Sequence, residues 1–132
     1  MRSRAVITSA KKGNEGIGIY LHWNGELETV LAFLTVARER RFRDLMEDEQ
    51  YGMARLTGLI HEFTGRYNNS SLGIGIMSEL DTDNGDNGTY VIGQNWHIVE
   101  RWGSGSDSRK TLEELDNEER AYYERVVYSL SI

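Results

Sequence analysis

Two stretches near the start of the chain, 2–9 and 17–23, alternate apolar and polar residues and flank the turn KKGNEG. A period of two predicts β-strands, and a short glycine-containing turn predicts that they pair as a hairpin. From Leu27 to about Arg41 the apolar residues recur at helical spacing, and a second helical stripe occupies about 50–64. The first half of the chain is therefore predicted to form two strands followed by two helices.

The segment LGIGIMSEL places Leu72, Ile74 and Ile76 on one side of a predicted strand and two glycines on the other. Glycines at such positions indicate that another part of the structure closely approaches that face. Two further strands, TYVIG and WHIVERW, follow the loops DTDNGDNG and GQN. Because such loops typically join antiparallel strands, residues 72–102 are predicted to form a three-stranded antiparallel meander.

The end of the chain carries two successive helix-start signals, Thr111 with Glu114 and Asp116 with Glu119. In each pair the first side chain can cap the helix and the second can bond back to the first residue. The predicted buried stripe of this helix is Tyr123, Val126, Val127 and Leu130. The order ββααβββα predicts one α+β domain spanning the whole chain, with an antiparallel sheet packed by helices. The segment 103–108 (GSGSDS) has the composition of a flexible linker.

The composition is that of a folded protein without covalent staples. The chain has 132 residues, of which 39% are hydrophobic, so it can bury a core without disulfides or metals. It contains no cysteine, which excludes disulfide frameworks, thiolate metal sites and cysteine nucleophiles. No apolar stretch has the length of a signal sequence or a membrane span. We therefore expect a cytoplasmic protein without membrane association, located in the host cytoplasm if a phage encodes it.

Charge is unevenly distributed in this chain of net charge −6, because acidic residues concentrate in its middle. An acidic surface can bind a partner protein by charge complementarity, for example by occupying a channel that normally holds nucleic acid. Binding of this kind needs no catalytic group. The predicted partner-binding residues are Asp44, Glu47, Asp48, Glu49, Asp81, Asp83 and Asp86.

A short basic cluster lies at the end of the first predicted helix. Its residues are Arg38, Arg40, Arg41 and Arg43. Because guanidinium groups bind phosphate in defined geometries, this cluster offers an alternative function, a nucleic-acid or nucleotide-binding module. The aromatic stripe Trp96, Ile98 and Trp102 could stack bases, but a small α+β domain must cover its sheet, so we predict that this stripe is a core face.

No pattern in the sequence is specific for catalysis or for a metal. The histidines His22, His61 and His97 are far apart and belong to no ligand motif. The loop 81–86 has the oxygen-rich composition that a calcium ion can use, but Gly85 stands at a ligand position of the EF-hand pattern. Spacing alone assembles no nucleophile, base and orienting residue. We therefore predict no metal and no cofactor, and an enzyme of unknown class is only the second alternative.

Two short motifs carry a resemblance to a known family. They are Arg4-Ala5 in the first strand and Ile19-Tyr20-Leu21-His22-Trp23-Asn24-Gly25 at the end of the second, with a fainter echo between Tyr90 and Val99. They resemble small bacterial and phage proteins of uncharacterised activity, which begin with an Arg-Ala strand and carry a His-Trp-Asp/Asn-Gly element. Glu26-Leu27 departs from that family's aromatic-proline-glutamate sequence. The resemblance implies a phage or mobile-element accessory protein and supplies no activity to transfer.

The His-Trp-Asn-Gly element also has a structural interpretation. Trp23 is predicted to close the core at the strand end, Asn24 to cap the following helix, and Gly25 to permit a tight entry into it. Strand alternation points His22 away from Trp23. A functional strand end formed by His22 and Trp23 is the alternative interpretation.

Together these observations favour a non-enzymatic accessory protein that binds a protein partner. The specific hypothesis is an inhibitor of a host protein, or of an antiviral-defence protein of the CRISPR type, that acts through its acidic surface. No pattern in the sequence identifies the partner or the oligomeric state.

We predict weak binding to generic duplex DNA at physiological salt, because the net charge is −6 and the arginine cluster is short. A mobility-shift titration measures this. Micromolar or tighter affinity that falls steeply with salt, and that is lost when Arg38, Arg40, Arg41 and Arg43 become alanine, would instead favour the nucleic-acid-binding alternative.

Overall fold

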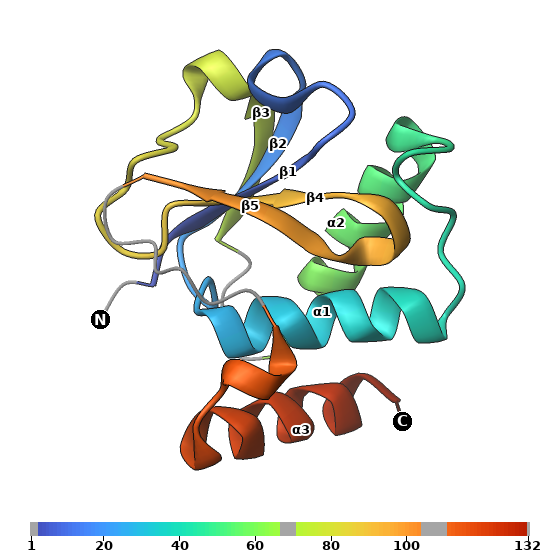
Figure 1. The fold of residues 1–132 in the computed structure, drawn as a ribbon, viewed down its shortest axis with the longest axis vertical. Coiled ribbons are helices and arrows are strands. Elements are labelled where there is room, and N and C mark those ends of the chain that lie inside the picture. Colours follow the sequence, from blue (N-terminus) through green and yellow to red (C-terminus); the bar gives the residue numbers. More distant parts are fainter. Residues whose placement is uncertain (1–2, 67–70, 104–110, 132) are drawn as a thin grey trace.

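The first strand of the chain, β1 (Ala5–Ser9), lies at the centre of the sheet in the computed structural model, which describes residues 3–66, 71–103 and 111–131 (Figure 1). Within these residues the sheet has five strands in the order β3-β2-β1-β4-β5. The other strands are β2 (Ile17–Leu21), β3 (Leu72–Ile76), β4 (Thr89–Ile92) and β5 (Ile98–Trp102). All residues of β1 and β4 are buried, as expected for strands that are covered on both faces.

The predicted helices are present, and the predicted α+β class is confirmed. The helices are α1 (Leu27–Glu39), α2 (Glu49–Gly65) and α3 (Asn117–Ser131). The predicted hairpin is also confirmed, since β1 and β2 run antiparallel with Ile7 opposite Ile19. Among the described residues, no helix is both long enough and apolar enough to cross a bilayer.

Two predictions about the sheet are wrong. The segment 72–102 is not a meander, because β3 pairs with β2 on one side of the sheet whereas β4 and β5 lie on the other. The sheet is also not wholly antiparallel, because β1 and β4 run parallel, with Ile7 beside Tyr90. Burial explains the difference. β1 and β4 carry apolar residues on both faces, and pairing at the centre of the sheet covers both faces.

The central helix α1 lies between the sheet and α3 (Figure 1). It is buried around most of its circumference, and Phe33 meets Phe63 of α2 edge-on with ring centroids 5.6 Å apart. On its outer side α1 packs against α3, where the Thr35 and Tyr123 hydroxyls are 2.7 Å apart. One continuous hydrophobic core therefore joins the three helices to one face of the sheet.

The opposite face of the sheet is covered by the chain that follows β3. A short 3-10 helix, η2 (Met77–Glu79), brings Met77 and Leu80 over Gly18, where an added Cβ atom would lie 2.5 Å from the Met77 sulfur. An added Cβ at Gly75 would lie 3.2 Å from Leu80. The predicted close approach to the glycines of β3 is therefore confirmed at Gly75, whereas no described atom comes within 4 Å of a Cβ at Gly73.

The His-Trp-Asn-Gly element differs from its prediction at Asn24. This residue has a left-handed backbone (φ 66°) and does not cap α1, because Glu26 occupies the capping position. Gly25 is required there, since an added Cβ would lie 2.6 Å from both the Ala5 Cβ and the Ser3 carbonyl oxygen. The motif is explained by the close approach of the helix entry to the start of β1.

Both helix-start signals before α3 are confirmed. Thr111 and Glu114 form a capping box around a short 3-10 helix, η4 (Leu112–Glu114). Asp116 then accepts a hydrogen bond of 2.8 Å from the Glu119 N–H, and the Glu119 carboxylate accepts one of 2.9 Å from the Asp116 N–H. The predicted flexible segment 103–108 lies outside the described residues, apart from Gly103.

The two internal glycines of α2 provide a matched test of packing. Gly58→Ala should raise the free energy of unfolding by about 1 kcal/mol, because alanine is the better helix former and no described atom lies within 4 Å of the added Cβ. Gly52→Ala should lower it by about 1–3 kcal/mol, because its Cβ would lie 2.6 Å from Leu45 and 2.8 Å from the Arg43 carbonyl oxygen. Urea denaturation of both variants measures these changes. Stabilisation of the same size in both would contradict the packing described at Gly52.

Candidate functional site

The most accessible apolar side chains of the sheet lie on β3, its edge strand. Ile74 is 58% exposed and Ile76 is 52% exposed, and Ile17 of the neighbouring β2 is 40% exposed. Ile17 pairs with Ile76 and Ile19 pairs with Ile74, so these side chains share one face of the sheet. Ile19 belongs to the helix-covered core. The helical cover therefore ends before β3 and leaves an apolar strip along this edge.

The backbone of β3 also offers unpaired hydrogen-bonding groups. The His22 N–H donates to the Ser71 carbonyl (3.0 Å), and the Met77 N–H donates to the Gly16 carbonyl (2.9 Å). In an antiparallel pair, residues whose N–H and C=O groups point toward the neighbouring strand alternate with residues whose N–H and C=O groups point away from it. The N–H and C=O groups of Leu72, Ile74 and Ile76 therefore point away from β2, and among the described residues no strand pairs with them.

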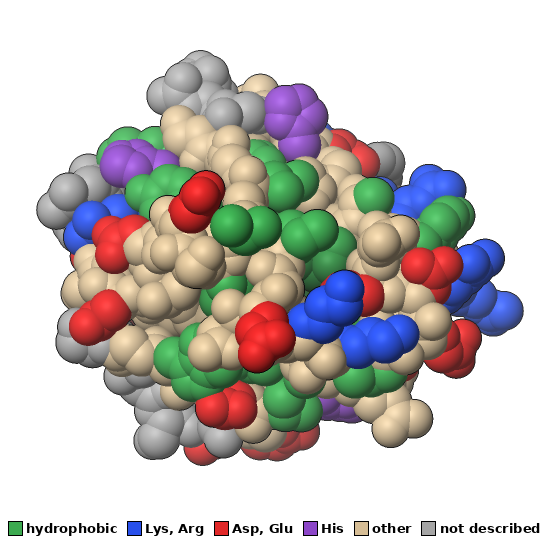
Figure 2. All heavy atoms as spheres, turned by 90° about the horizontal axis from the view of Figure 1, so that it is seen from above, with side chains coloured by type: hydrophobic (Ala, Val, Ile, Leu, Met, Phe, Trp, Pro, Cys, Tyr) green, Lys and Arg blue, Asp and Glu red, His purple; other side chains and the backbone are tan. Residues whose placement is uncertain are grey.

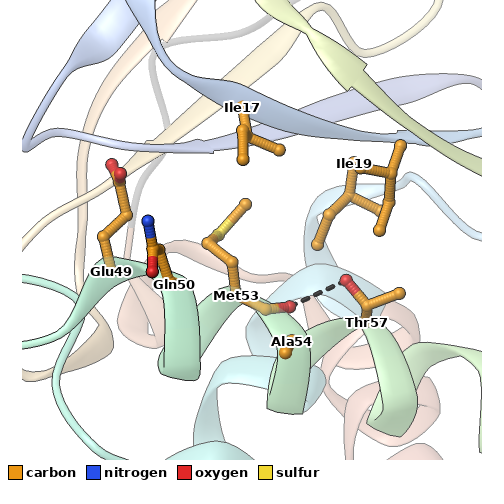
Figure 3. Close-up of a pocket in the computed structure, with 8 residues that line it drawn as sticks. Ile17, Ile19, Glu49, Gln50, Met53, Ala54 and Thr57 are labelled. Carbon is orange, nitrogen blue, oxygen red and sulfur yellow. Dashed lines mark hydrogen bonds between the residues drawn. The ribbon is translucent and has the colours of Figure 1, made fainter.

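A pocket of about 200 Å³ lies between α2 and this apolar strip (Figure 3). Met53 points from α2 into the space between the helix and the strand that carries Ile17 and Ile19. Glu49 stands at one end of the pocket, and near the other end the Thr57 hydroxyl donates to the Met53 carbonyl (2.7 Å). Most of the lining is apolar, which suits an aliphatic group.

Glu49 is the charged side chain of this pocket. It is 9% exposed, and its Oε2 atom is buried without a hydrogen-bond partner among the described residues. It belongs to the first turn of α2, where the helix dipole favours a negative charge. Gly16 lies beside it, since an added Cβ there would be 3.8 Å from Oε2. The pocket therefore joins an apolar wall, to which Ile74 of β3 contributes, to an acidic end.

Figure 2 looks onto the end of the molecule that carries the β1–β2 turn, η2 and the start of α2. Hydrophobic side chains gather near the centre of this face, and acidic and basic side chains surround them. An apolar centre with a charged rim is typical of surfaces that bind other proteins.

The predicted acidic residues that precede α2 have mainly structural roles. Asp44 accepts hydrogen bonds from two backbone N–H groups, including that of Asn95 at 2.6 Å. Asp48 caps α2 by accepting from the Tyr51 N–H at 3.1 Å. Glu47 is exposed, and Glu49 is the buried acid of the pocket. This predicted set therefore contains one residue, Glu49, that lines the candidate site.

The predicted acidic loop 81–86 lies away from the start of α2 (Figure 1) and is held by Arg4. The Arg4 N–H and Nε both donate to Asp86, at 3.0 and 2.9 Å, and Asp81 lies 3.7 Å from the same guanidinium. Asn84 is buried and accepts hydrogen bonds from three backbone N–H groups of the loop, whereas Asp83 is exposed. In the described part of the chain, no three side chains of the metal-binding types come together.

The predicted arginine cluster is dispersed over several structural contacts. Arg38 donates to the backbone of the turn before β5 at 3.3 Å, and Arg40 donates to the last turn of α3 at 2.8 Å. Arg43 pairs with Asp48 at 2.9 Å. Arg41 is exposed, with a left-handed backbone (φ 58°). These contacts spread the guanidinium groups over three different parts of the fold.

His22 and Trp23 form a small aromatic group at the end of β2. The His22 Nδ1 atom and the Tyr20 hydroxyl are 3.0 Å apart. The prediction that His22 points away from Trp23 is wrong, because the two rings meet edge-on with centroids 4.8 Å apart. All three side chains are half-buried. These contacts give the pair a structural role and do not bring it into the pocket beside α2.

The stripe near β5 is mainly a core face, as predicted. Trp96 is 2% exposed and donates to the Phe42 carbonyl at 3.3 Å, and Ile98 is 8% exposed. Trp102 is half-buried at the end of the strand. Stacking of bases along the stripe is therefore disfavoured, because Trp96 does not present a ring to solvent.

The sequence predicted the strand at 72–76 but not its role. Glycines along one side of a strand are a signal for an edge, since a central strand is usually apolar on both faces. The spacing of residues along the sequence gave no comparable signal for the pocket beside α2. Glu49 was predicted to bind a partner from an exposed surface, together with Glu47, and only the fold separates the buried acid from the exposed one.

Comparison with known proteins leaves the fold and the site to be interpreted on their own. No protein-family model, curated protein or solved structure shows significant similarity to this chain.

The cap of α2 predicts a specific pH dependence of stability. The hydrogen bond from the Tyr51 N–H, followed by that from Arg43, lowers the pKa of Asp48 below its ordinary value of 3.8. A lowered native pKa stabilises the fold above the ordinary pKa, and this stabilisation is lost as the pH falls through the native pKa. Asp48→Asn should therefore have a lower free energy of unfolding than the wild type at neutral pH, and this difference should decrease as the pH falls through the native pKa of Asp48.

Urea denaturation of the wild type and of Asp48→Asn from neutral pH to about one unit below the ordinary pKa of aspartate measures this effect. Glu47→Gln is the matched control, because it removes one exposed carboxylate that caps no helix. A difference between wild type and Asp48→Asn that stays constant over this pH range would show that the charge of Asp48 does not stabilise α2.

Proposed function

We propose that this protein is a non-enzymatic protein-binding domain that captures an extended segment of a partner protein by adding it as a strand to β3. The observation that carries the proposal is that β3 is an apolar edge strand whose outward N–H and C=O groups have no strand partner among the described residues. Strand addition gives affinity through main-chain hydrogen bonds and gives specificity through pockets for alternate side chains.

The two edges of the sheet differ in a way that supports this assignment. At β5 the register shifts between Val91 and Ile92, and the strand carries Glu100 and Arg101. Bulges and charges are the usual means by which proteins protect an edge from pairing. β3 has neither, since it pairs with β2 in continuous register and contains only leucine, isoleucine and glycine. An unprotected apolar edge in a small protein indicates a surface that a binding partner covers when the protein functions.

The side chains of β3 favour an extended apolar partner. Ile74 and Ile76 are more than half exposed on the face toward α2, and a paired strand would cover both. Fully burying one aliphatic side chain contributes about 1.5–3 kcal/mol, of which about half is still to be gained at these positions. The pocket beside α2 lies next to this strip and can receive a longer side chain from the added strand.

The other functional hypotheses stay predictions of the sequence. The phage or mobile-element origin and the inhibitor role rest on the short resemblance alone. The nucleic-acid-binding alternative is less favoured, because Arg38, Arg40 and Arg43 are engaged in structural contacts. Binding through the acidic residues is also less favoured, because Asp44, Asp48 and Asp86 bind groups of this chain.

Ile76→Asp should weaken binding of an extended peptide by about tenfold or more, because a carboxylate replaces an apolar contact at the edge. Short peptides selected from a randomised display library on the immobilised wild-type protein serve as the probe. Val99→Asp is the matched control, since Val99 is 49% exposed on the opposite edge strand. It should bind the selected peptides like the wild type, and circular dichroism should show both variants folded.

Amide hydrogen exchange locates the bound peptide independently. The amides of Leu72, Ile74 and Ile76 should become protected on binding, because they point away from β2. Selected peptides that bind Ile76→Asp like the wild type, or that leave these amides unprotected, would overturn the proposal. A dimer in light scattering that Ile76→Asp dissociates and Val99→Asp does not would assign the edge to a second copy of this chain instead.

A further inference from the structure

We infer that the pocket between α2 and β3 binds an alkylammonium group, presented by a lysine side chain of the partner segment. The inference rests on the proposed strand addition for the source of the lysine, but the pocket chemistry stands on its own. The observation that carries it is the buried carboxylate of Glu49 at the end of a mostly apolar pocket.

Glu49 is a buried acid whose hydrogen bonding is incomplete. It is 9% exposed, and no described group donates to its Oε2 atom. A buried charge without a donor is costly, so buried acids are normally paired or hydrogen-bonded. The first turn of α2 offsets part of this cost through the helix dipole but donates nothing to Oε2. An ammonium group at this end of the pocket would supply the missing donor once the Glu49 carboxylate turns toward it.

The shape of the pocket selects the kind of cation. Its lining is mostly apolar and includes Ile17 and Met53, so the ligand needs an aliphatic stem (Figure 3). A single buried acceptor atom suits the compact charge of an ammonium better than the two-pronged guanidinium. A four-carbon stem that ends in an ammonium is the lysine side chain.

The position of the pocket is within reach of a strand added to β3. Neighbouring strands lie about 4.8 Å apart, so an added strand would run roughly 10 Å from β2. The pocket lies over β2 and β3, through Ile17, Ile19 and Ile74. Only a long side chain can extend from the added strand over β3, and one that starts beside Ile76, which pairs with Ile17 next to Gly16, begins at the end of the strip where Glu49 lies.

The same acid favours a different partner over a second copy of this chain. Two copies could pair through β3, because the sequence LGIGI would place apolar residues opposite apolar residues. That arrangement would bring no cation to the pocket, since β3 contains no charged residue. The Oε2 atom of Glu49 would stay without a donor. A partner segment with a lysine satisfies both the edge and the acid.

Titration of the full chain with n-pentylammonium, followed by NMR of the isoleucine and methionine methyl groups, tests the inference. The resonances of Ile17, Met53 and Ile74 should shift together, with a dissociation constant on the order of millimolar for so small a ligand. Glu49→Gln should weaken this binding about 10- to 100-fold, because it removes the charge-assisted hydrogen bond and keeps the shape.

Glu47→Gln is the control variant, because it removes the same charge from an exposed position two residues earlier. It should bind n-pentylammonium like the wild type. Neutral n-pentanol is the control ligand, and Glu49→Gln should not weaken its binding. Absence of any methyl shift in the wild type, or equal affinity of wild type and Glu49→Gln for n-pentylammonium, would overturn the inference.

The two proposals can fail separately. Ile76 does not line the pocket and an added carboxylate attracts rather than repels a cation, so Ile76→Asp should not weaken n-pentylammonium binding. If n-pentylammonium binds through Glu49 but Ile76→Asp binds the selected peptides like the wild type, strand addition is refuted and ammonium binding in the pocket is supported. If selected peptides bind through Ile76 and a lysine-to-methionine change in each of them costs nothing, strand addition stands and the lysine assignment fails.

Discussion

The parallel pairing of β1 with β4 is the contact on which the rest of the structure depends. It brings the beginnings of both strands to the same end of the sheet, with Val6 beside Thr89. Arg4, just before β1, therefore meets the loop that leads into β4 and pairs with Asp86 there. The pairing also fixes the two edges, because β2 and β3 can extend the sheet on one side only. The candidate site on β3 exists because β1 and β4 occupy the centre.

Several charged residues in the described part of the chain pair with each other inside the fold. Arg4 and Asp86 join β1 to the loop before β4, and Asp48 joins the start of α2 to Arg43. Ion pairs that solvent partly screens contribute little free energy, but their hydrogen bonds position loops. The net charge of −6 therefore overstates the acidic surface that is available to a partner. Glu49 differs from these residues, because its buried oxygen lacks a donor in the described structure.

The candidate site arises where the helical layer ends. α1 is covered by α3 on its outer side and by the sheet on its inner side, so most of its surface is buried within the fold (Figure 1). α2 covers the sheet only as far as Ile19, and the next strand out carries Ile74 with more than half of its side chain exposed. The space between helix and edge strand is the pocket. A rigid helix on one side and an open strand on the other are suited to holding an extended segment.

The sequence by itself determined the elements of this protein, because apolar periodicity and capping pairs are local. The hairpin of β1 and β2, the buried stripe of α2 and the capping pair of Asp116 with Glu119 all follow from residues close in the chain. The order of the strands was decided only by tertiary structure, because pairing β1 with β4 depends on how two distant apolar strands share one core. The difference in burial between Glu49 and Glu47 was likewise decided only by the tertiary structure. Both are acids before or at a helix start, and only the packing of α2 against the sheet buries one of them.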